Sequence, residues 1–203
     1  MNRASCHFAL AVGLAFATVS AVADVNELAQ GCNGCHGEQG VSQWDEMPTI
    51  AGIDAFTHSE SLYAYRDGNR PCAPATFRNG PRAGEEATMC EASEALSDED
   101  VEAIAAHYAA LPFVPAKQDF DAALAETGKA IHAENCSRCH SEGGSNADDE
   151  ASILAGQWMG YLRGAFAEFA SGERYQPDKM KEVMDPLSDA DVDALIHYYA
   201  SQQ

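Results

Sequence analysis

The sequence predicts an all-α protein built from two tandem domains of similar size. Three observations support this prediction: a five-residue motif that occurs twice, a helix-start signal that occurs twice, and apolar residues at helical spacing around both. The motif is Cys-x-x-Cys-His, which begins at Cys32 and again at Cys136, 104 residues later. The helix-start signal is Leu-Ser-Asp-x-Asp, which begins at Leu96 and again at Leu187. A serine followed by acidic residues favours a helix N-terminus, so each copy should open a helix.

The repeated motif is typical of covalent attachment of a c-type haem. Two thiols bond the vinyl groups of the porphyrin, and the adjacent histidine binds the iron. The residues concerned are Cys32, Cys35 and His36 in the first copy and Cys136, Cys139 and His140 in the second. A single copy could also be chance, a zinc half-site or a redox dithiol. Two copies in a chain with an export signal indicate two covalently bound haems c with their iron, and hence electron transfer.

Residues 1–23 have the features of a signal peptide. Arg3 provides a short basic segment, residues 8–19 are small and apolar, and Ala21-Val22-Ala23 fits a cleavage site. The apolar run is too short to span a bilayer comfortably and no second run follows, so we expect no membrane anchor. The mature protein would be periplasmic and would begin at residue 24.

We expect a first domain over residues 24–112, a linker over 113–117 and a second domain over 118–203. The linker prediction rests on two prolines, Pro112 and Pro115, which follow the last helix of the first half. Domains of this size are marginal on their own apolar surface. A buried porphyrin would therefore form a large part of each core.

The predicted elements follow one another in the same order in both halves. A helix leads into each motif, over residues 25–31 and residues 121–135. Polar loops that contain glycine follow the motifs. Amphipathic helices should then begin after Ala51-Gly52 and after Ala155-Gly156, which are again 104 residues apart. The final helices carry two apolar stripes, which are Val101, Ile104, Ala105 and Tyr108 in the first half and Val192, Leu195, Ile196 and Tyr199 in the second.

Two arginines also repeat at the spacing of 104 residues. Gly68 and Gly172 should end the amphipathic helices, and Arg70 and Arg174 follow them. The arginines could pair with haem propionates or lie at solvated helix ends.

The register between the halves changes before the final helices. The Leu-Ser-Asp segments are 91 residues apart, so the first half carries 13 extra residues between Arg70 and Met89. This insert is rich in proline and glycine, which indicates an irregular loop. Cys72 lies in this insert and Cys90 follows it directly after Met89, and neither belongs to a motif. In an oxidising compartment a structural disulfide is the economical interpretation. The alternative is that Cys90 binds iron as a thiolate.

An iron that shuttles electrons needs a second axial ligand, usually histidine or methionine. Met89 lies eight residues before Ser97, and Met180 lies eight residues before Ser188. No other pair of methionines keeps this register, so we predict Met89 and Met180 as ligands, with Met184 as the alternative for the second iron. We expect packing or surface roles for the histidines of the mature chain outside the motifs, which are His58, His107, His132 and His197.

The chain is strongly acidic, with 32 acidic against 12 basic residues and a formal net charge of −20. Such a charge makes nucleic acid and anionic membrane surfaces poor partners. It could speed encounters with a basic partner protein, or it could reflect a saline habitat.

Each half resembles a class I cytochrome c in its motif, its Ala-Gly helix start, its methionine and its Leu-Ser-Asp helix. Two such halves resemble the tandem dihaem cytochromes of the cytochrome c-four type. Residues 113–203 are more closely similar to the cytochrome subunit of flavocytochrome c sulfide dehydrogenase. The similar segments are 115–128, 140–144, 153–158 and 199–203. Two features depart from these patterns: the insert, and Ser152 in place of the proline that Pro48 provides in the first half. In class I domains the carbonyl of that proline holds the ligand histidine.

The resemblance implies that a separate flavoprotein subunit oxidises sulfide and passes electrons singly to these haems, which hand them to a second redox protein. No segment resembles a flavin or sulfide site, so we do not expect the chain itself to be an enzyme. The alternatives are a free-standing dihaem carrier between a membrane complex and a terminal oxidase, and a dihaem enzyme such as a peroxidase or thiosulfate dehydrogenase. Partner docking is expected at residues 153–166 and 111–120, where acidic residues are sparse, unless these residues pack on haem or between the domains.

Overall fold

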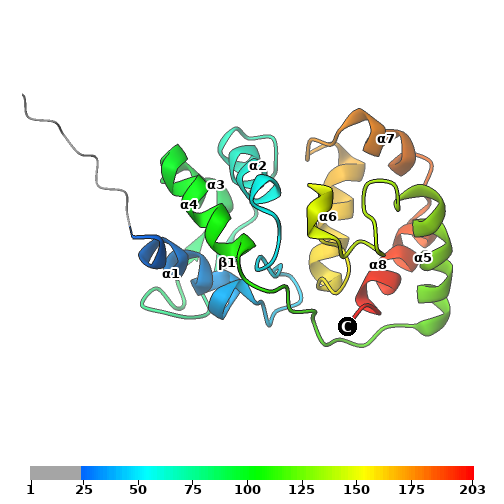
Figure 1. Cartoon of the computed structure of the whole chain (residues 1–203), viewed down its shortest axis with the longest axis horizontal. Coiled ribbons are helices and arrows are strands. Elements are labelled where there is room, and N and C mark those ends of the chain that lie inside the picture. The colour runs from blue at the N-terminus through cyan, green and yellow to red at the C-terminus, as the bar shows by residue number, and fades with distance from the viewer. Residues whose placement is uncertain (1–23) are drawn as a thin grey trace, which may run out of the picture.

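The computed structural model describes residues 24–203, and the predicted signal peptide lies outside them. The first half contains α1 (Val25–His36), α2 (Ala55–Arg66), α3 (Met89–Glu94), α4 (Asp98–Ala109), the 3-10 turn η1 (Glu38–Gly40) and a hairpin of β1 (Ala75–Thr76) and β2 (Glu86–Ala87). The second half contains α5 (Ala122–Asn135), α6 (Met159–Ser171), α7 (Asp178–Met184), α8 (Asp189–Ala200) and the 3-10 turn η2 (Ala147–Asp149). The all-α prediction is confirmed. Figure 1 shows the two halves side by side, joined along one edge by a linker that contains neither helix nor strand.

The two final helices begin where the sequence predicts. The Ser97 hydroxyl accepts a hydrogen bond from the backbone N–H of Asp100 (3.1 Å), and the Asp100 carboxylate accepts one from the Ser97 N–H (3.1 Å). Ser188 and Asp191 form the same reciprocal pair in the second half (3.2 and 2.9 Å). Each pair satisfies two N–H groups that a helix start leaves without partners.

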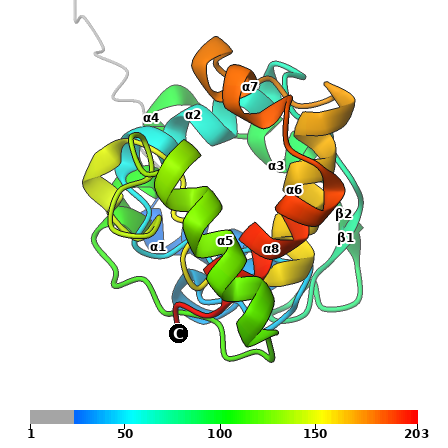
Figure 2. The ribbon, with the colours of Figure 1, turned by 90° about the vertical axis from the view of Figure 1, so that its right-hand side faces the viewer.

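Both cores form where the final helix crosses the helix that leads into the motif. In the first half, the hydroxyl of buried Tyr108 donates to the side-chain oxygen of Asn33 on α1 (2.8 Å). In the second half, Figure 2 shows α5 crossing α8. A β-carbon at Gly128 would clash there with the Ala194 carbonyl, so glycine is what lets these two backbones approach. None of the helices within residues 24–203 is long and apolar enough to cross a membrane.

The two halves contact each other through the start of α6. The buried side chain of Gln157 accepts from the Thr49 N–H (3.0 Å) and donates to the Thr49 carbonyl (2.7 Å). The Trp158 indole N–H donates to the carbonyl of Ser42 (3.1 Å), and Asp45 accepts from the N–H of Gly160 (2.8 Å). Partner docking at this part of residues 153–166 is therefore wrong, and the alternative of packing between the domains is confirmed.

The insert is fixed at its ends by the predicted disulfide, which links Cys72 and Cys90 across 18 residues of sequence. Within the insert, β1 pairs with β2 in antiparallel register, with Ala75 opposite Ala87. The hairpin also reaches α1, because the N–H of Arg78 donates to the Gly34 carbonyl (2.7 Å). The insert is thus an ordered hairpin that packs on the first motif, whereas the sequence predicts an irregular loop.

Candidate cofactor sites

A cavity of about 640 Å³ lies in the first half and gathers the predicted site residues of that half. Cys32, Cys35, His36 and Met89 all line it. Most of its remaining walls are apolar, including Leu28, Ile50, Leu62, Phe77, Leu96 and Ile104. A volume of several hundred cubic ångströms with apolar walls and a few polar groups suits a large planar cofactor. The residues present therefore fit a haem.

The histidine of the first motif is buried and oriented by the backbone. His36 Nδ1 lies 3.0 Å from the Pro48 carbonyl oxygen, to which it can only donate. Nε2 of the neutral ring is then free to bind a metal ion. Burial lowers the pKa of His36 to about 4, against the opposing effect of that hydrogen bond. The imidazole is therefore neutral at pH 7, as iron binding requires.

The cysteine pairs lack the electrostatics of a redox dithiol. Burial raises the pKa of the Cys32 and Cys35 thiols, and it raises the pKa of Cys136 in the second motif. A redox-active Cys-x-x-Cys pair typically has a lowered thiol pKa. The structure thus favours attachment over thiol redox chemistry at the first motif.

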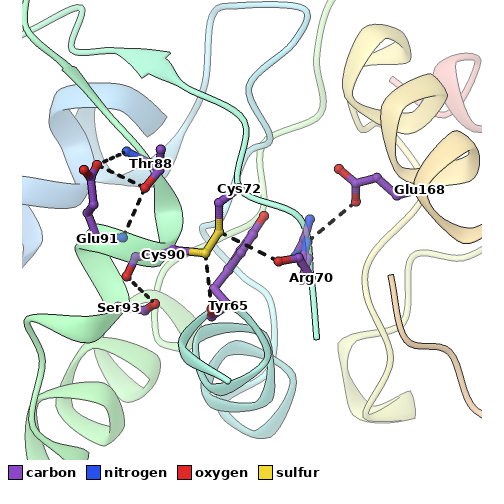
Figure 3. Close-up of a disulfide and its surroundings, with 8 residues drawn as sticks. All are labelled: Tyr65, Arg70, Cys72, Thr88, Cys90, Glu91, Ser93 and Glu168. Carbon is purple, nitrogen blue, oxygen red and sulfur yellow. Dashed lines mark hydrogen bonds and ion pairs between the residues drawn. A yellow bond between two sulfur atoms is a disulfide. The ribbon is translucent and has the colours of Figure 1, made fainter. Parts of the chain in front are cut away.

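Met89 is the first residue of α3, a helix that the sequence analysis missed. The N-cap of α3 is Thr88, which forms a capping box with Glu91. The Thr88 N–H donates to the Glu91 carboxylate (2.8 Å), and the Glu91 N–H donates to the Thr88 hydroxyl (3.2 Å). The spacing Thr-x-x-Glu is a signal that could have found this helix. The next residue, Cys90, is committed to the disulfide, so the alternative of a Cys90 thiolate ligand is wrong (Figure 3). Met47 also lines the cavity.

The second motif lies in a turn rather than inside a helix. α5 ends at Asn135, and the N–H groups of Cys139 and His140 then both donate to the Cys136 carbonyl (3.1 and 2.9 Å). Cys139 is exposed. Burial lowers the pKa of His140, and a hydrogen bond to the carbonyl of Ser152 opposes this shift. Serine thus supplies the same backbone acceptor as Pro48 does in the first half.

The methionines predicted for the second site lie on one helix. Met180 and Met184 are both half-buried on α7, which follows α6 after a short connection. Of the histidines outside the motifs, His58 and His132 are buried, and each bonds within its own half: His58 Nε2 to the Ile50 carbonyl (2.7 Å) and His132 Nδ1 to the Tyr199 hydroxyl (3.0 Å). The predicted packing role is confirmed for these two.

Arg70 and Arg174 meet at the boundary between the halves instead of facing solvent. Arg70 is only 8% exposed, lines the first cavity and donates to the Tyr161 hydroxyl (3.2 Å). Its guanidinium lies 3.9 Å from a carboxylate oxygen of Glu168, and that of Arg174 lies 3.7 Å from the same oxygen. Burial raises the pKa of Tyr161, but the two guanidinium groups outweigh it and lower the pKa overall. The alternative of solvated helix ends is wrong.

Four residues of the second half line the first cavity: Ser152, Ile153, Gln157 and Tyr161. The sequence analysis missed this role. The residue 104 positions before Tyr161 is Thr57, so comparing the repeats gives no signal for it.

Both halves thus combine a helical fold, a paired-cysteine motif, a histidine held by a backbone carbonyl and a helix that carries methionine. These features define a dihaem c-type cytochrome, which transfers electrons rather than acting as an enzyme. The family model described as cytochrome c matches residues 22–111, and the one described as cytochrome c oxidase, cbb3-type, subunit III matches residues 123–198.

Cytochrome c-554(548) from Halomonas halodenitrificans is 35% identical to the chain over 77 residues, which cover 38% of this chain and 80% of that protein. The chain belongs to the cytochrome c family, and it carries two covalently bound c-type haems.

Two further relatives match nearly the whole chain. The thiosulfate dehydrogenase electron acceptor of Stutzerimonas stutzeri is 28% identical over 192 residues, which cover 87% of this chain and 81% of that protein. Cytochrome c4 of Azotobacter vinelandii is 26% identical over 213 residues, which cover 98% of each. The crystal structure of reduced cytochrome c4 from Pseudomonas stutzeri superimposes with a TM-score of 0.69 at 24% identity over 90% of this chain and all of that one, which supports the fold.

Proposed function

We propose that this dihaem cytochrome is a periplasmic carrier that accepts single electrons from a dehydrogenase of reduced sulfur compounds and passes them to a second redox protein. The observation that carries the proposal is the similarity, over most of both chains, to a protein named as the electron acceptor of thiosulfate dehydrogenase. The resemblance of residues 113–203 to the cytochrome subunit of flavocytochrome c sulfide dehydrogenase points to the same class of donor. The two donors to be compared are therefore a thiosulfate dehydrogenase and a flavoprotein that oxidises sulfide.

In this proposal each haem is attached by the two thiols of its motif and held between a histidine and a methionine. The residues are Cys32, Cys35, His36 and Met89 for the first haem and Cys136, Cys139, His140 and Met180 for the second. Haem iron supplies one-electron chemistry between its ferric and ferrous states, and a thioether ligand raises the reduction potential. The carbonyls of Pro48 and Ser152 orient the two histidines and make them better ligands.

The boundary between the halves supports electron transfer within the molecule. Because Ile153 and Tyr161 of the second half line the first cavity, a haem held there would border the other domain. Gln157 fixes the two halves against each other through both polar groups of the Thr49 backbone. These contacts would hold a haem in the first cavity at a fixed position relative to the second half.

The ligand assignment is tested by spectroscopy of methionine variants. Both ferric haems should be low-spin with histidine and methionine ligands, and should together give the weak methionine-to-iron band near the red edge of the visible spectrum. Met89→Ala and Met180→Ala should each remove about half of that band, since one of two thioether ligands is lost. Met47→Ala and Met184→Ala are the matched controls and should retain it. A high-spin haem in the unaltered protein would contradict the assignment and favour an enzyme.

The donor is tested by rapid mixing of the oxidised cytochrome with purified dehydrogenases. One reaction contains thiosulfate dehydrogenase and thiosulfate, the other contains a sulfide-oxidising flavoprotein and sulfide, and each control omits the dehydrogenase. We expect catalytic amounts of at least one of the two to reduce both haems. If neither does, while a membrane complex that oxidises quinol reduces them, the protein is a free-standing carrier and the proposal fails.

A further inference from the structure

The disulfide of the first half lies immediately beside the proposed iron ligand of that half. Cys90 follows Met89 directly, and both belong to the first turn of α3. Cys72 follows Arg70 after one residue, just beyond α2. The disulfide therefore joins the residue next to Met89 to the segment that leaves α2 (Figure 3).

Both sulfur atoms of the disulfide also contact backbone carbonyl oxygens. The sulfur of Cys90 lies 3.3 Å from the carbonyl oxygen of Tyr65 on α2, and that of Cys72 lies 3.8 Å from the Arg70 carbonyl oxygen. Neither sulfur carries a proton in the disulfide, so these are contacts and not hydrogen bonds. The Cys90 contact places α3 against the end of α2, beside the cavity that Met89 lines.

The other contacts of the insert are non-covalent, and its second strand, β2, ends at Ala87, two residues before Met89. Its hairpin bonds to the first motif, where the N–H groups of Arg78 and Asn79 both donate to the Gly34 carbonyl (2.7 and 3.1 Å). The Thr88–Glu91 capping box lies within α3 itself and is exposed. Met89 thus ends a 20-residue segment that starts at Arg70, and the disulfide is the covalent tie that shortens it.

In the second half, the connection that leads from the end of α6 to the predicted methionine ligand is much shorter. Only five residues separate Arg174 from Met180, and this connection contains no cysteine. The length of the chain itself keeps α7 close to the end of α6. The extra 13 residues of the first half would remove that restraint, and the disulfide restores it.

We propose that Cys72 and Cys90 are positioning residues for the first haem, whose disulfide holds the Met89 thioether against the iron and so keeps the potential of that haem high. This inference rests on the ligand set of the proposed function. It does not depend on the identity of the electron donor. Loss of the disulfide should release Met89 from the iron in a fraction of molecules, because the freed segment explores many more conformations.

The test uses the full-length holoprotein with Cys72→Ser and Cys90→Ser combined. We expect the methionine-to-iron band to fall toward half of its original intensity, and the potential of the first haem to drop while that of the second is unchanged. In the Met89→Ala background the same serine pair should cause no further loss of the band. Ala105→Gly is the control for general destabilisation, since Ala105 is buried in α4 and does not line the cavity. It should leave both potentials unchanged.

A chemical route keeps the test decisive if the serine variant does not fold. The unaltered protein is treated with a water-soluble trialkylphosphine, which breaks the S–S bond and yields two thiols and the phosphine oxide. The phosphine gives up two electrons, and water supplies the oxygen and both protons. Iodoacetamide then caps the thiols with release of iodide, and ferricyanide reoxidises the haems before the spectrum is recorded. The same partial loss of the band is expected.

Two results would overturn the inference in different ways. If Met89→Ala halves the band but opening the disulfide leaves the band and both potentials intact, the disulfide only stabilises the fold. If Met89→Ala itself leaves the band intact, the ligand assignment fails and the positioning role fails with it. Neither result bears on reduction by a sulfur-compound dehydrogenase, so the donor proposal is judged separately.

Discussion

The two halves hold equivalent sites by different means. In the second half a short connection brings α7 close to α6, and the motif lies open, with Cys139 exposed. In the first half a long insert covers the motif, and a disulfide ties its far end beside Met89. The difference is visible within the motifs: Gly34 lies under the Phe77 ring of the insert, whereas the equivalent Arg138 is exposed. A repeated motif therefore does not imply a repeated environment.

This comparison indicates which haem is easier for a partner to approach. The cysteine edge of the first site is screened by the hairpin, while that of the second is not covered by an equivalent segment, because the second half lacks the 13 residues. The halves also differ in their dependence on chain length, since one relies on a crosslink and the other on a short connection. The following predictions test how far this asymmetry extends.

The largest effect is expected from removing either pair of attaching thiols. Without its haem, the first half would have to keep or collapse a cavity of about 640 Å³. At about 24 cal/mol per Å³ an empty cavity of that size costs on the order of 15 kcal/mol, as much as a whole domain's stability. Cys32→Ala with Cys35→Ala should unfold the first half and leave the second haem attached. Cys136→Ala with Cys139→Ala should do the reverse, as circular dichroism and haem content would report. Retention of the full helical signal would contradict this.

Opening the disulfide should destabilise the first half alone. Crosslinking a loop of this length restricts the unfolded chain and contributes about 3 kcal/mol on the chain-entropy estimate. Cys72→Ser with Cys90→Ser should lower the free energy of unfolding of the first half by this order, while both haems stay attached. Denaturant titration followed at each haem measures the effect, and an equal loss in both halves would argue against a local role.

Exchanging the third residues of the two motifs, Gly34 and Arg138, should reduce stability much more in the first half than in the second. A β-carbon at Gly34 would lie 2.5 and 3.0 Å from two atoms of the Phe77 ring. Gly34→Arg should therefore displace the insert and destabilise by about 2 kcal/mol, within the usual range for overpacking. Arg138→Gly, in an exposed turn, should change stability by less than about 0.5 kcal/mol. Thermal unfolding compares the two. Equal costs would show that the insert does not press on the motif.

Gln157 tests whether the halves unfold together. Replacing it with alanine leaves the N–H and carbonyl of buried Thr49 without their partners. The expected cost is about 2 kcal/mol, because buried polar groups lose their hydrogen bonds. Calorimetry should then show the transitions of the two halves further apart than in the unaltered protein. Gln43→Ala, at an exposed glutamine on the same loop, is the control and should leave the unfolding curve unchanged.

Local signals in the sequence predicted the disulfide and six of the eight α-helices within residues 24–203, but they missed α3 and α7. Ser97 and Ser188 marked helix starts because capping depends on neighbours three residues away. Cys72 and Cys90 were paired by elimination, since the motifs account for every other cysteine of residues 24–203. The β1–β2 hairpin escaped prediction because two-residue strands in a segment rich in glycine and proline show no alternation.

Contacts between the halves could not be predicted, because nothing local encodes them. Thr49 and Gln157 are 108 residues apart, and Arg70 and Tyr161 are 91 apart. The sparse charge of residues 153–166 indicated a buried surface correctly but gave no means of telling a partner protein from the other domain. Likewise, the spacing of Arg70 and Arg174 marked them as equivalent, yet only the fold brings both to Glu168.

The smallest effect should be equal in the two halves. Ser97→Ala and Ser188→Ala each remove the hydroxyl that accepts from the third N–H of the final helix, at 3.1 and 3.2 Å. Each should lower the free energy of unfolding by about 1 kcal/mol, the usual cost of losing such a cap. Threonine at either position keeps the hydroxyl and serves as the control, with a loss of only a few tenths. Denaturant titration at each haem measures all four variants. Equal costs would show that the asymmetry between the halves ends before the final helix. A clearly larger cost for Ser97 would mean that the insert, eight residues upstream at Met89, also depends on how that helix begins.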